Sequence, residues 1–191
     1  MSTNLLVVAL EDEYPTSLLR PNCGLIYTGV GKVNATLQLT KTLSTWREPN
    51  LPKVINYGTA GSVNSKYTGL VEVDVLIQRD MITEPLSPRG IVPYDTSNYS
   101  GAIMLNSNTN ITCGTGDSFV TEKDPWFEYS SVDIVDMEAY ALARVCRDFG
   151  VNFRCFKYIS DSADENSATD WEENVHRGNS LFQEMLYRGG F

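Results

Sequence analysis

Hydrophobic residues in this chain form short continuous apolar runs, and between these runs lie segments in which apolar residues recur with helical spacing. The runs are rich in β-branched residues and end at turn-forming residues, which is typical of buried strands. Elsewhere, apolar residues spaced three and four apart predict amphipathic helices. The pattern predicts strands over 5–10, 23–28, 52–57, 71–78, 102–105, 132–135 and 153–159, and helices over 34–46, 139–149 and 170–186. Gly178, in the middle of the last helix, disfavours an unbroken one.

One stretch, from 135 to 164, joins two strands through one helix and ends in an acidic turn. Gly150 ends the helix, and 160–164 breaks the second apolar run with hydrogen-bonding turn residues. Glu138 and Asp161 therefore lie just past the ends of the two strands. A right-handed crossover would make these strands parallel and place both loops on the same edge of the sheet. In open α/β sheets, ligands bind at that edge.

Composition and charge narrow the function classes. The 191 residues predict a single domain, 1–191, which is long enough to bury a substantial core. With 42% hydrophobic and 20% charged residues, the composition is that of an ordinary globular protein. The formal net charge of −9 opposes binding to nucleic acid or to an anionic membrane.

The expected location is the cytoplasm. The amino terminus has no basic start, and the apolar run from Leu5 to Leu10 is too short for a signal peptide or a membrane span. The four cysteines show no metal-ligand spacing. Cys146 and Cys155 lie in apolar runs, which favours buried thiols in a reducing compartment.

Two motifs carry a family resemblance. Residues 136–139 (DMEA), followed by 159–164 (ISDSAD), resemble the signature of purine nucleoside phosphorylases and nucleosidases. Within that superfamily, the chain most resembles the 5′-methylthioadenosine/S-adenosylhomocysteine nucleosidases. The resemblance extends from Leu5 to about Trp171 and is weakest over 81–110, where this chain is shorter. It implies an α/β fold, a three-layer α/β/α sandwich with a central mixed, largely parallel sheet.

Two further segments near the amino terminus resemble the nucleosidases. Residues 11–13 form an acidic cluster that, taken alone, suits the positive end of a helix. In the nucleosidases the last carboxylate of a similar segment binds the attacking water, which implies that role for Glu13. Residues 29–34 lack the residues that a P-loop or a dinucleotide fingerprint requires. They resemble a helix start of the nucleosidases, and we interpret the glycines as sites of close backbone packing.

The segments expected to contact the substrate have ordinary structural interpretations as well. Residues 58–62 (GTAGS) have the composition of a turn. They resemble a loop beneath the ribose in the nucleosidases, which implies that Thr59 and Gly61 contact the substrate. Phe119 and Val120 resemble a segment whose aromatic ring stacks on the purine and whose next backbone group holds the base. Without the resemblance, Phe119 would more often be a core residue.

The resemblance also separates two reactions. Phosphorylases of the superfamily carry an arginine just before the glycine loop and another in an amino-terminal segment, and both bind phosphate. This chain has Asn56 and Tyr57 before the loop, and 10–13 (LEDE) after the first strand. Phosphate recognition depends on arginine forks, and a carboxylate at Glu13 would repel an anion. A hydrolase is therefore favoured.

Carboxylates carry the remaining chemistry. Cleavage of an N-ribosidic bond passes through a cationic sugar, so it needs a proton for the leaving base, anionic support for the sugar and a placed nucleophile. With the resemblance, Asp161 is the candidate acid toward N-7 of the purine, and Glu138 accepts from the ribose 2′- and 3′-hydroxyls. Met137 and Ser160 are expected beside the substrate. In isolation, Glu138 is more typical of a helix-start charge and Asp161 of a turn residue.

We expect no cofactor and no metal. The single histidine excludes His-based zinc sites and triads, and the acidic residues near Asp161 lack the spacing of a calcium loop. The sequence favours an N-ribohydrolase that releases adenine from nucleosides of the 5′-methylthioadenosine/S-adenosylhomocysteine class. The resemblance implies a homo-oligomer, with a dimer expected here, since the resembling family is usually dimeric or larger. A phosphate-dependent purine nucleoside phosphorylase and a catalytically silent nucleoside-binding module stay open as alternatives, as does the 5′ substituent of the substrate.

Overall fold

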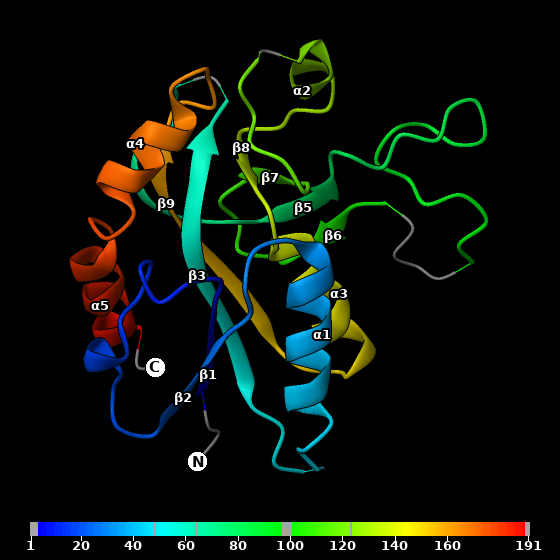
Figure 1. Cartoon of the computed structure of the whole chain (residues 1–191). Helices are drawn as coiled ribbons and strands as arrows, with labels where there is room; N and C mark the ends of the chain where they lie inside the picture. The colour runs from blue at the N-terminus through cyan, green and yellow to red at the C-terminus, as the bar shows by residue number, and fades with distance from the viewer. Residues whose placement is uncertain (1–3, 48, 64, 97–100, 123, 190–191) are drawn as a thin grey trace.

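The protein is built around a strongly twisted mixed sheet (Figure 1). The computed structural model describes residues 4–47, 49–63, 65–96, 101–122 and 124–189. Within them the strand order is β2-β1-β3-β8-β7-β5-β6, with β9 beside β3 and β4 beside β9. The strands are β1 (Asn4–Val8), β2 (Cys23–Tyr27), β3 (Lys53–Ser62), β4 (Gly69–Glu72), β5 (Val75–Gln78), β6 (Ile103–Met104), β7 (Thr112–Thr115), β8 (Ile134–Asp136) and β9 (Phe153–Asp161).

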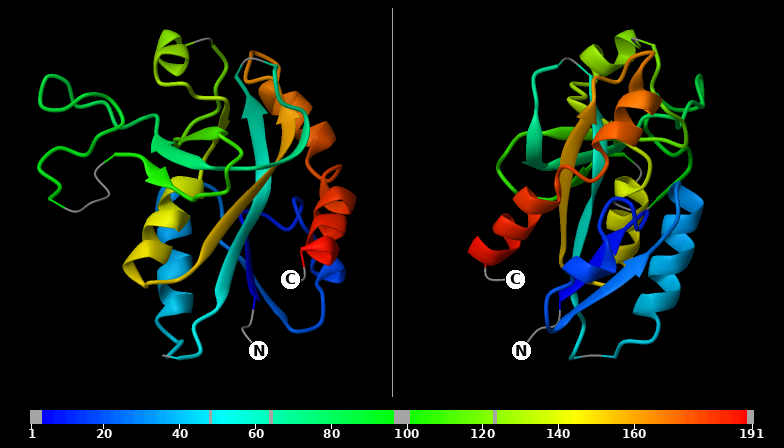
Figure 2. Two further views of the ribbon diagram at one scale, coloured as in Figure 1. Left: turned by 180° about the vertical axis from the view of Figure 1, so that it is seen from behind. Right: turned by 60° about the vertical axis from the view of Figure 1, so that its left-hand side comes forward.

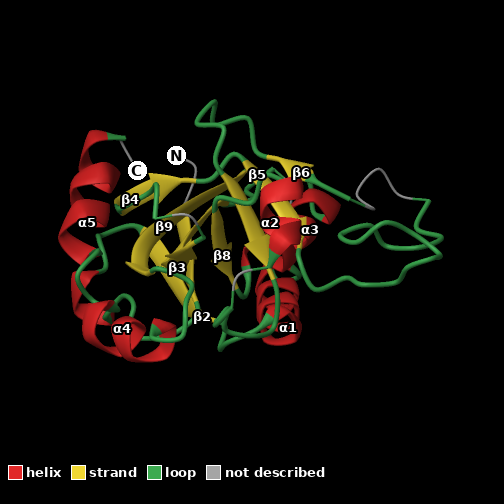
Figure 3. Cartoon of the chain, turned by 90° about the horizontal axis from the view of Figure 1, so that it is seen from above, coloured by secondary structure: helices red, strands yellow, loops and turns green. Residues whose placement is uncertain are grey.

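Helices cover both faces of this sheet (Figures 1 and 2). One layer contains α1 (Lys32–Leu43) and α3 (Ala139–Asp148), and the other contains α4 (Ser167–Asn174) and α5 (Asn179–Arg188). The view from above separates these pairs clearly (Figure 3). A short α2 (Pro125–Tyr129) and a 3-10 turn, η1 (Thr16–Leu18), complete the helices of the described residues. The predicted three-layer α/β/α sandwich is confirmed.

Side chains that alternate along the strands form a hydrophobic core on each face of the sheet. Leu5 and Val7 of β1 pack in the cluster beneath α1 and α3, whereas Leu6 and Val8 pack with Phe182 and Leu186 of α5. Successive side chains of a strand point to opposite faces, so a strand covered on both sides is apolar throughout.

The predicted helix after 138 is present. Its apolar positions, among them Leu142, Ala143 and Cys146, are buried against α1 and the sheet. Gly150 follows with φ 66°, a left-handed conformation that glycine adopts without strain. The chain can therefore turn sharply into β9.

Two predicted strand boundaries are wrong. Residues 58–62, which have a turn composition, continue β3, because β9 pairs with β3 as far as Gly61. The predicted strand 71–78 is two strands, β4 and β5, on different partners. The break lies at Asp74, whose carboxylate accepts the backbone N–H of Ser107 and so is held in a loop. The last predicted helix is also divided, with Gly178 just before α5.

The prediction that β8 and β9 run parallel is also wrong. Of the eight strand pairings formed by the described residues, five are parallel, but β3 pairs with β8 antiparallel and with β9 parallel. The overlap of β8 with β3 is confined to Gly61 and Ser62. The sheet is thus mixed and largely parallel, as predicted, although the two strands joined by α3 run in opposite directions.

This arrangement leaves an opening along one edge of β3. From Val54 to Gly61, β9 occupies the other edge. On the edge facing away from β9, β1 pairs with β3 as far as Asn56, and β8 begins pairing at Gly61. Because β1 is parallel and β8 antiparallel to β3, their carboxyl ends approach each other from opposite directions. Residues 57–60 of β3 therefore face a space between two strand ends.

The segment between β5 and β6 projects away from the sheet (Figure 1). Its described part, 79–96, exposes Ile82, Leu86 and Tyr94. It includes much of 81–110, where the resemblance is weakest, and residues 97–100 lie outside the described chain. None of the helices formed by the described residues has the length and apolar composition needed to cross a membrane.

Candidate active site

A cavity of about 240 Å³ lies at the opening along β3. All nine predicted site residues line it, namely Glu13, Thr59, Gly61, Phe119, Val120, Met137, Glu138, Ser160 and Asp161. They come from β3 and β9, from the segments that follow β1 and β8, and from the loop after β7. Residues that the sequence did not single out also contribute to its wall, including Leu10, Val30, Arg79, Asp136 and Trp171. The carboxyl ends of strands and the loops that follow them thus supply most of the lining.

Glu13 is fixed against the free edge of β3. Its Oε1 accepts the backbone N–H of Thr59 and the Thr59 hydroxyl, each at 2.8 Å. Its Oε2 accepts the backbone N–H of Leu10 at 3.2 Å. The Thr59 amide lies where neither β1 nor β8 pairs with β3, so the carboxylate takes a donor that would otherwise be left unpaired. Only 5% of Glu13 is exposed.

Glu138 lies opposite, at the start of α3. Its Oε1 accepts the backbone N–H of Gly31 at 2.8 Å, which joins the amino ends of α1 and α3. Burial is the main cause that raises the pKa of Glu138 to about 8, while Lys157 opposes the rise and Asp136 adds to it. Near neutral pH this carboxyl group is therefore largely protonated, so it can donate as well as accept a hydrogen bond.

A buried ion pair that sequence reasoning missed lies beside the cavity. Lys157 of β9 places its Nζ 2.8 Å from Asp136 Oδ2. Burial alone would lower the pKa of Lys157, but the Asp136 carboxylate raises it well above its usual value. Burial favours neutral Asp136, yet Lys157 holds the pKa of Asp136 below its usual value. The one available signal was a lysine inside the apolar run 153–159, since a buried lysine requires a partner.

Asp136 also organises the start of α3. The same Oδ2 accepts the backbone N–H of Ala139 at 2.8 Å, and Oδ1 accepts the Thr115 hydroxyl at 2.6 Å. The Thr115 oxygen in turn accepts the backbone N–H of Tyr140 at 3.0 Å. These bonds satisfy the first amides of α3, so they determine where Glu138 enters the cavity.

Asp161 is placed at the end of β9. Its Oδ2 accepts the Ser160 hydroxyl at 2.8 Å, and its Oδ1 accepts the backbone N–H of Ala163 at 3.0 Å. Gly61 lies directly beneath it, and a side chain there would collide with Asp161 Oδ1. A glycine at this position lets the carboxylate sit close to β3.

The loop after β7 carries Phe119, whose ring is 50% exposed and lies at the cavity wall. It is therefore not a core residue, and stacking on a base stays a prediction.

Arg79, which follows β5, fixes the loop after β7 by hydrogen bonds to its backbone and to Ser118. Its Nη2 donates to the carbonyl oxygen of Gly116 at 2.9 Å and to that of Ser118, and its Nη1 donates to the Ser118 hydroxyl at 3.2 Å. Burial lowers the pKa of Arg79.

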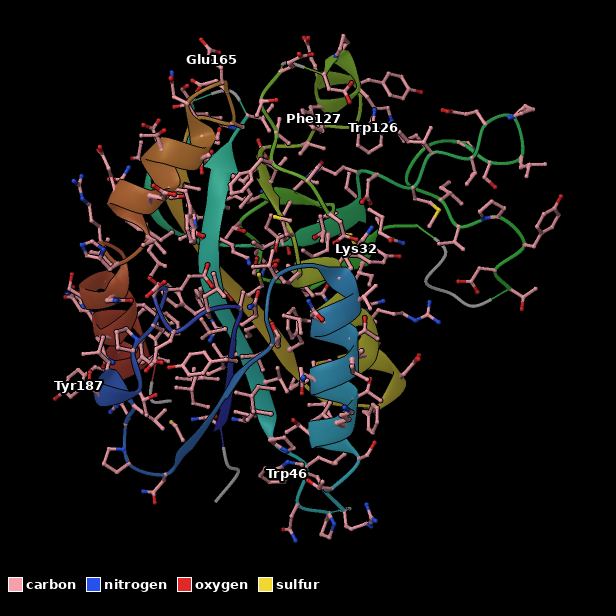
Figure 4. The ribbon with its side chains drawn as sticks, in the orientation of Figure 1. Lys32, Trp46, Trp126, Phe127, Glu165 and Tyr187 are labelled. Atoms are coloured by element: carbon pink, nitrogen blue, oxygen red, sulfur yellow. The ribbon has the colours of Figure 1, made fainter. Side chains whose placement is uncertain are left out.

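The segment 29–34 contributes backbone groups. Gly31 has φ 92°, and a Cβ there would lie 3.1 Å from Asp117 Oδ1, which agrees with close backbone packing. The next amide, that of Lys32, donates to Asp117 Oδ1 at 2.8 Å. Figure 4 shows Lys32 at the first turn of α1. Carboxylates of two other segments thus take the first free amides of this helix, where they are favourable.

Three carboxyl groups from separate strand ends therefore surround one cavity, at Glu13, Glu138 and Asp161. Together they can supply what glycosidic cleavage requires, namely a group that transfers a proton, an acceptor for sugar hydroxyls and a base for water. Among the described residues, no group of three His, Cys, Asp or Glu side chains is arranged to hold a metal ion.

Comparisons with known proteins identify the family of this chain. The profile of the Phosphorylase superfamily matches residues 105–188. A 5′-methylthioadenosine/S-adenosylhomocysteine nucleosidase of Marinomonas sp. is 30% identical over 189 residues, which cover 85% of this chain and 79% of that protein.

Solved structures show the same fold. The 5′-methylthioadenosine/S-adenosylhomocysteine nucleosidase of Helicobacter pylori, crystallised with butyl-thio-DADMe-Immucillin-A, has a TM-score of 0.81 at 24% identity, covering 98% of this chain and 97% of that chain. The futalosine hydrolase of Helicobacter pylori has a TM-score of 0.82 at 22% identity, covering 97% and 96%. Two enzymes named for different substrates thus share this architecture.

Proposed function

We propose that this protein releases adenine from adenosine-type nucleosides. The premise is that the chain belongs to the family of 5′-methylthioadenosine/S-adenosylhomocysteine nucleosidases, within the phosphorylase superfamily, and is a hydrolase of N-glycosyl bonds. The observation that carries the proposal is the meeting of Glu13, Glu138 and Asp161 around one cavity. A single residue of this kind would be unremarkable, but three carboxyl groups with separate hydrogen-bond partners match the needs of one reaction.

In the proposed mechanism, Asp161 donates a proton to N-7 of adenine as the bond between N-9 and the anomeric carbon breaks. Glu138 binds the ribose hydroxyls, and the negative charge of the cavity supports the cationic sugar. Glu13 accepts a proton from the water whose oxygen bonds to the anomeric carbon. The products are adenine and the free sugar, so atoms and charge balance with water as the only co-reactant.

Phe119 and Val120 are proposed to hold the base, with the ring of Phe119 on one face of the purine. The exposure of that ring at the cavity wall supports this role. Thr59, Gly61, Met137 and Ser160 complete the contacts to the nucleoside. A ring that is half exposed without ligand gains buried area when a base stacks on it, which favours binding.

The charge of the cavity supports a substrate without an anionic group at this position. Its ionisable lining residues are four carboxyl groups and one arginine, Glu13, Asp136, Glu138, Asp161 and Arg79, and the Arg79 guanidinium already donates to Gly116 and Ser118. Phosphate, which prefers free arginine forks, is disfavoured. Leu10, Val30 and Trp171 provide apolar surface in the same cavity. We therefore propose a 5′-methylthio group as the preferred 5′ substituent.

The test is product analysis with four nucleosides, 5′-methylthioadenosine, S-adenosylhomocysteine, adenosine and futalosine. Each is incubated with the protein in buffers with and without phosphate, and free base and sugar are separated by chromatography. We expect adenine from 5′-methylthioadenosine at the highest kcat/KM, a free sugar as the second product, and rates that do not change with phosphate.

Each alternative has its own signature in that experiment. A sugar 1-phosphate, or a rate that saturates with phosphate, would establish a phosphorylase. Binding of the nucleoside without release of base would establish a silent binding module. Preference for futalosine would leave the hydrolase intact and replace the proposed substrate.

We propose a homodimer and a cytoplasmic location on separate grounds. Val33 and Leu37 of α1 are exposed beside a groove between α1 and α3, and the projecting segment exposes Leu86 and Tyr94. A second copy could cover these apolar surfaces. Light scattering after gel filtration should give a dimer, and Leu37→Glu should give a monomer.

The proposed cytoplasmic location rests on the cysteines. All four are free thiols, which supports a reducing compartment.

A further inference from the structure

Helix α4 contacts three separate walls of the cavity with one face. Ser167, Trp171 and Asn174 are four and three residues apart, so they project from the same side of the helix. The Ser167 hydroxyl donates to the carbonyl oxygen of Val120 at 3.3 Å, and Asn174 Nδ2 donates to that of Ser160 at 2.8 Å. Between them, Trp171 Nε1 donates to Thr59 Oγ1 at 2.8 Å. The Thr59 hydroxyl that Trp171 contacts donates in turn to the Glu13 carboxylate.

The indole of Trp171 determines the direction of the next hydrogen bond. An indole N–H can donate but cannot accept, so the Thr59 oxygen is the acceptor from Trp171. The single hydroxyl proton of Thr59 is then available for Glu13 Oε1, 2.8 Å away. Thr59 is β-branched and therefore restricted at χ1. The contact with Trp171 thus selects the orientation in which Thr59 donates to Glu13.

These bonds leave one oxygen of Glu13 for water. Oε1 receives two donors, the amide and the hydroxyl of Thr59. Oε2 receives the amide of Leu10, at 3.2 Å, as its one hydrogen bond from the described residues. A carboxylate oxygen can accept from two donors, so Oε2 keeps acceptor capacity. Both Glu13 and Trp171 line the cavity, where the attacking water of the proposed function would lie.

We infer that Trp171 is a positioning residue for hydrolysis: through Thr59, its indole N–H orients the Glu13 carboxylate so that Oε2 takes the water. The inference rests on the proposed function and adds to it a residue that does not itself touch the reacting atoms. It also links α4 to the attacking water. If this helix moved, the Thr59 hydroxyl would lose its bond from Trp171 and would no longer be oriented toward Glu13.

The test is a double-mutant cycle with Trp171→Phe and Thr59→Val, measured as kcat and KM for the release of adenine from 5′-methylthioadenosine. Phenylalanine keeps an aromatic ring at the wall and removes the donor. We expect Trp171→Phe to lower kcat roughly tenfold, as loss of one oriented hydrogen bond would, with KM changed less than about threefold. In the Thr59→Val background, Trp171→Phe should have no further effect on kcat.

The matched control is Trp126→Phe, which makes the same chemical change outside the cavity. Trp126 lies at α2 (Figure 4), next to Arg89, whose guanidinium stacks 4.3 Å from the ring centre. This variant should keep the kcat of the wild type. A readout that does not use turnover is the ¹H–¹⁵N resonance of the Trp171 indole, which should move toward the position of a free indole in Thr59→Val.

The outcomes separate the inference from the function on which it rests. If the wild type is active and Trp171→Phe keeps its kcat, or if the two substitutions multiply in the cycle, the inference is wrong and the proposed function stands. An unchanged indole resonance in Thr59→Val would overturn it as well. If the wild type releases no base from any nucleoside, the proposed function fails, and the inference falls with it.

Discussion

The ammonium nitrogen of Lys157 lies 2.8 Å from the carboxylate of Asp136, and the two side chains are 1% and 0% exposed. The same carboxylate oxygen accepts the backbone N–H of Ala139. Strand β9 is thereby joined to the first turn of α3 by one buried oxygen atom. Since Asp161 lies on β9 and Glu138 precedes α3, this ion pair sets the distance between two of the three proposed functional carboxyl groups.

Substitution of Lys157 by methionine should destabilise the fold strongly. It leaves the Asp136 carboxylate buried without a counter-charge, and breaking a buried pair in this way costs about 3–5 kcal/mol. The double variant Lys157→Met with Asp136→Asn should recover part of that loss, because no charge is then left unpaired. Urea denaturation measures both. The control is Lys66→Met, because Lys66 is exposed and lies 3.8 Å from its partner Asp133; this variant should leave the free energy of unfolding nearly unchanged. Equal losses at both lysines would contradict the account.

Stability should fall as pH rises because of Glu138. Its pKa is about 8 in the folded protein against an ordinary value of 4.5. Between these values the folded state binds more protons than the unfolded state, so the free energy of unfolding decreases with rising pH. The contribution is complete below about pH 4.5 and is lost through pH 8.

Glu138→Gln removes this titration and keeps an oxygen that can accept from Gly31. The variant should therefore become more stable relative to the wild type as the pH increases from 5 to 8.5, by on the order of 2–4 kcal/mol. Urea denaturation across this range measures the difference. Parallel stability curves for the two proteins would show that Glu138 titrates as an ordinary carboxylate.

Asp161→Asn should abolish proton transfer to the leaving base. The amide keeps the shape and can still accept the N–H of Ala163, but its N–H protons are too weakly acidic to be transferred to the purine. We expect kcat to fall at least about a hundredfold, the low end for general acid catalysis, with the dissociation constant of 5′-methylthioadenosine nearly unchanged. Asp164→Asn is the control, because Asp164 bonds the Asn166 amide in the same loop and does not line the cavity. Near-normal turnover in Asp161→Asn would remove this residue from the mechanism.

Glu13→Gln should cut turnover by at least about a hundredfold, since an amide is not a base for water. It should not convert the protein to phosphate dependence, because the cavity supplies no free arginine in its described lining. Glu11→Gln, two residues earlier and exposed, should behave as the wild type. Initial rates with and without phosphate provide the measurement, and equal losses at both glutamates would mean that the effect is only one of net charge.

The residues that line the cavity could be predicted because their motifs are local. Residues 136–139 and 159–164 each lie at the end of one strand. Each motif therefore brings its own side chains to the cavity without help from other segments. The direction of the strands could not be predicted. A helix between two strands favours a parallel pair, but the short overlap of β8 with Gly61 and Ser62 reversed one of them. Such a pairing depends on residues more than 70 positions apart in sequence.

The missed residues share a physical reason. Lys157 and Arg79 are charged side chains in strands or at strand ends, and their roles depend on partners from other segments, Asp136 in one case and the carbonyl groups of the loop at Gly116 in the other. Residues 58–62 have turn composition, and pairing with β9 and β8 makes them a strand. Tertiary contacts overrode local preference in each instance.

The opening along β3 makes the active centre divisible. The first half of the chain carries Glu13 and the strand against which it rests, whereas Glu138 and Asp161 arrive with the second half. The projecting segment lies between the halves, and exposed loops tolerate cleavage. A chain cut near Tyr94 would therefore yield two fragments, neither of which contains a complete set of carboxyl groups. Recovery of activity when the two fragments are mixed would show that β8 and β9 have paired with β3. The protein could therefore be used as a split enzyme.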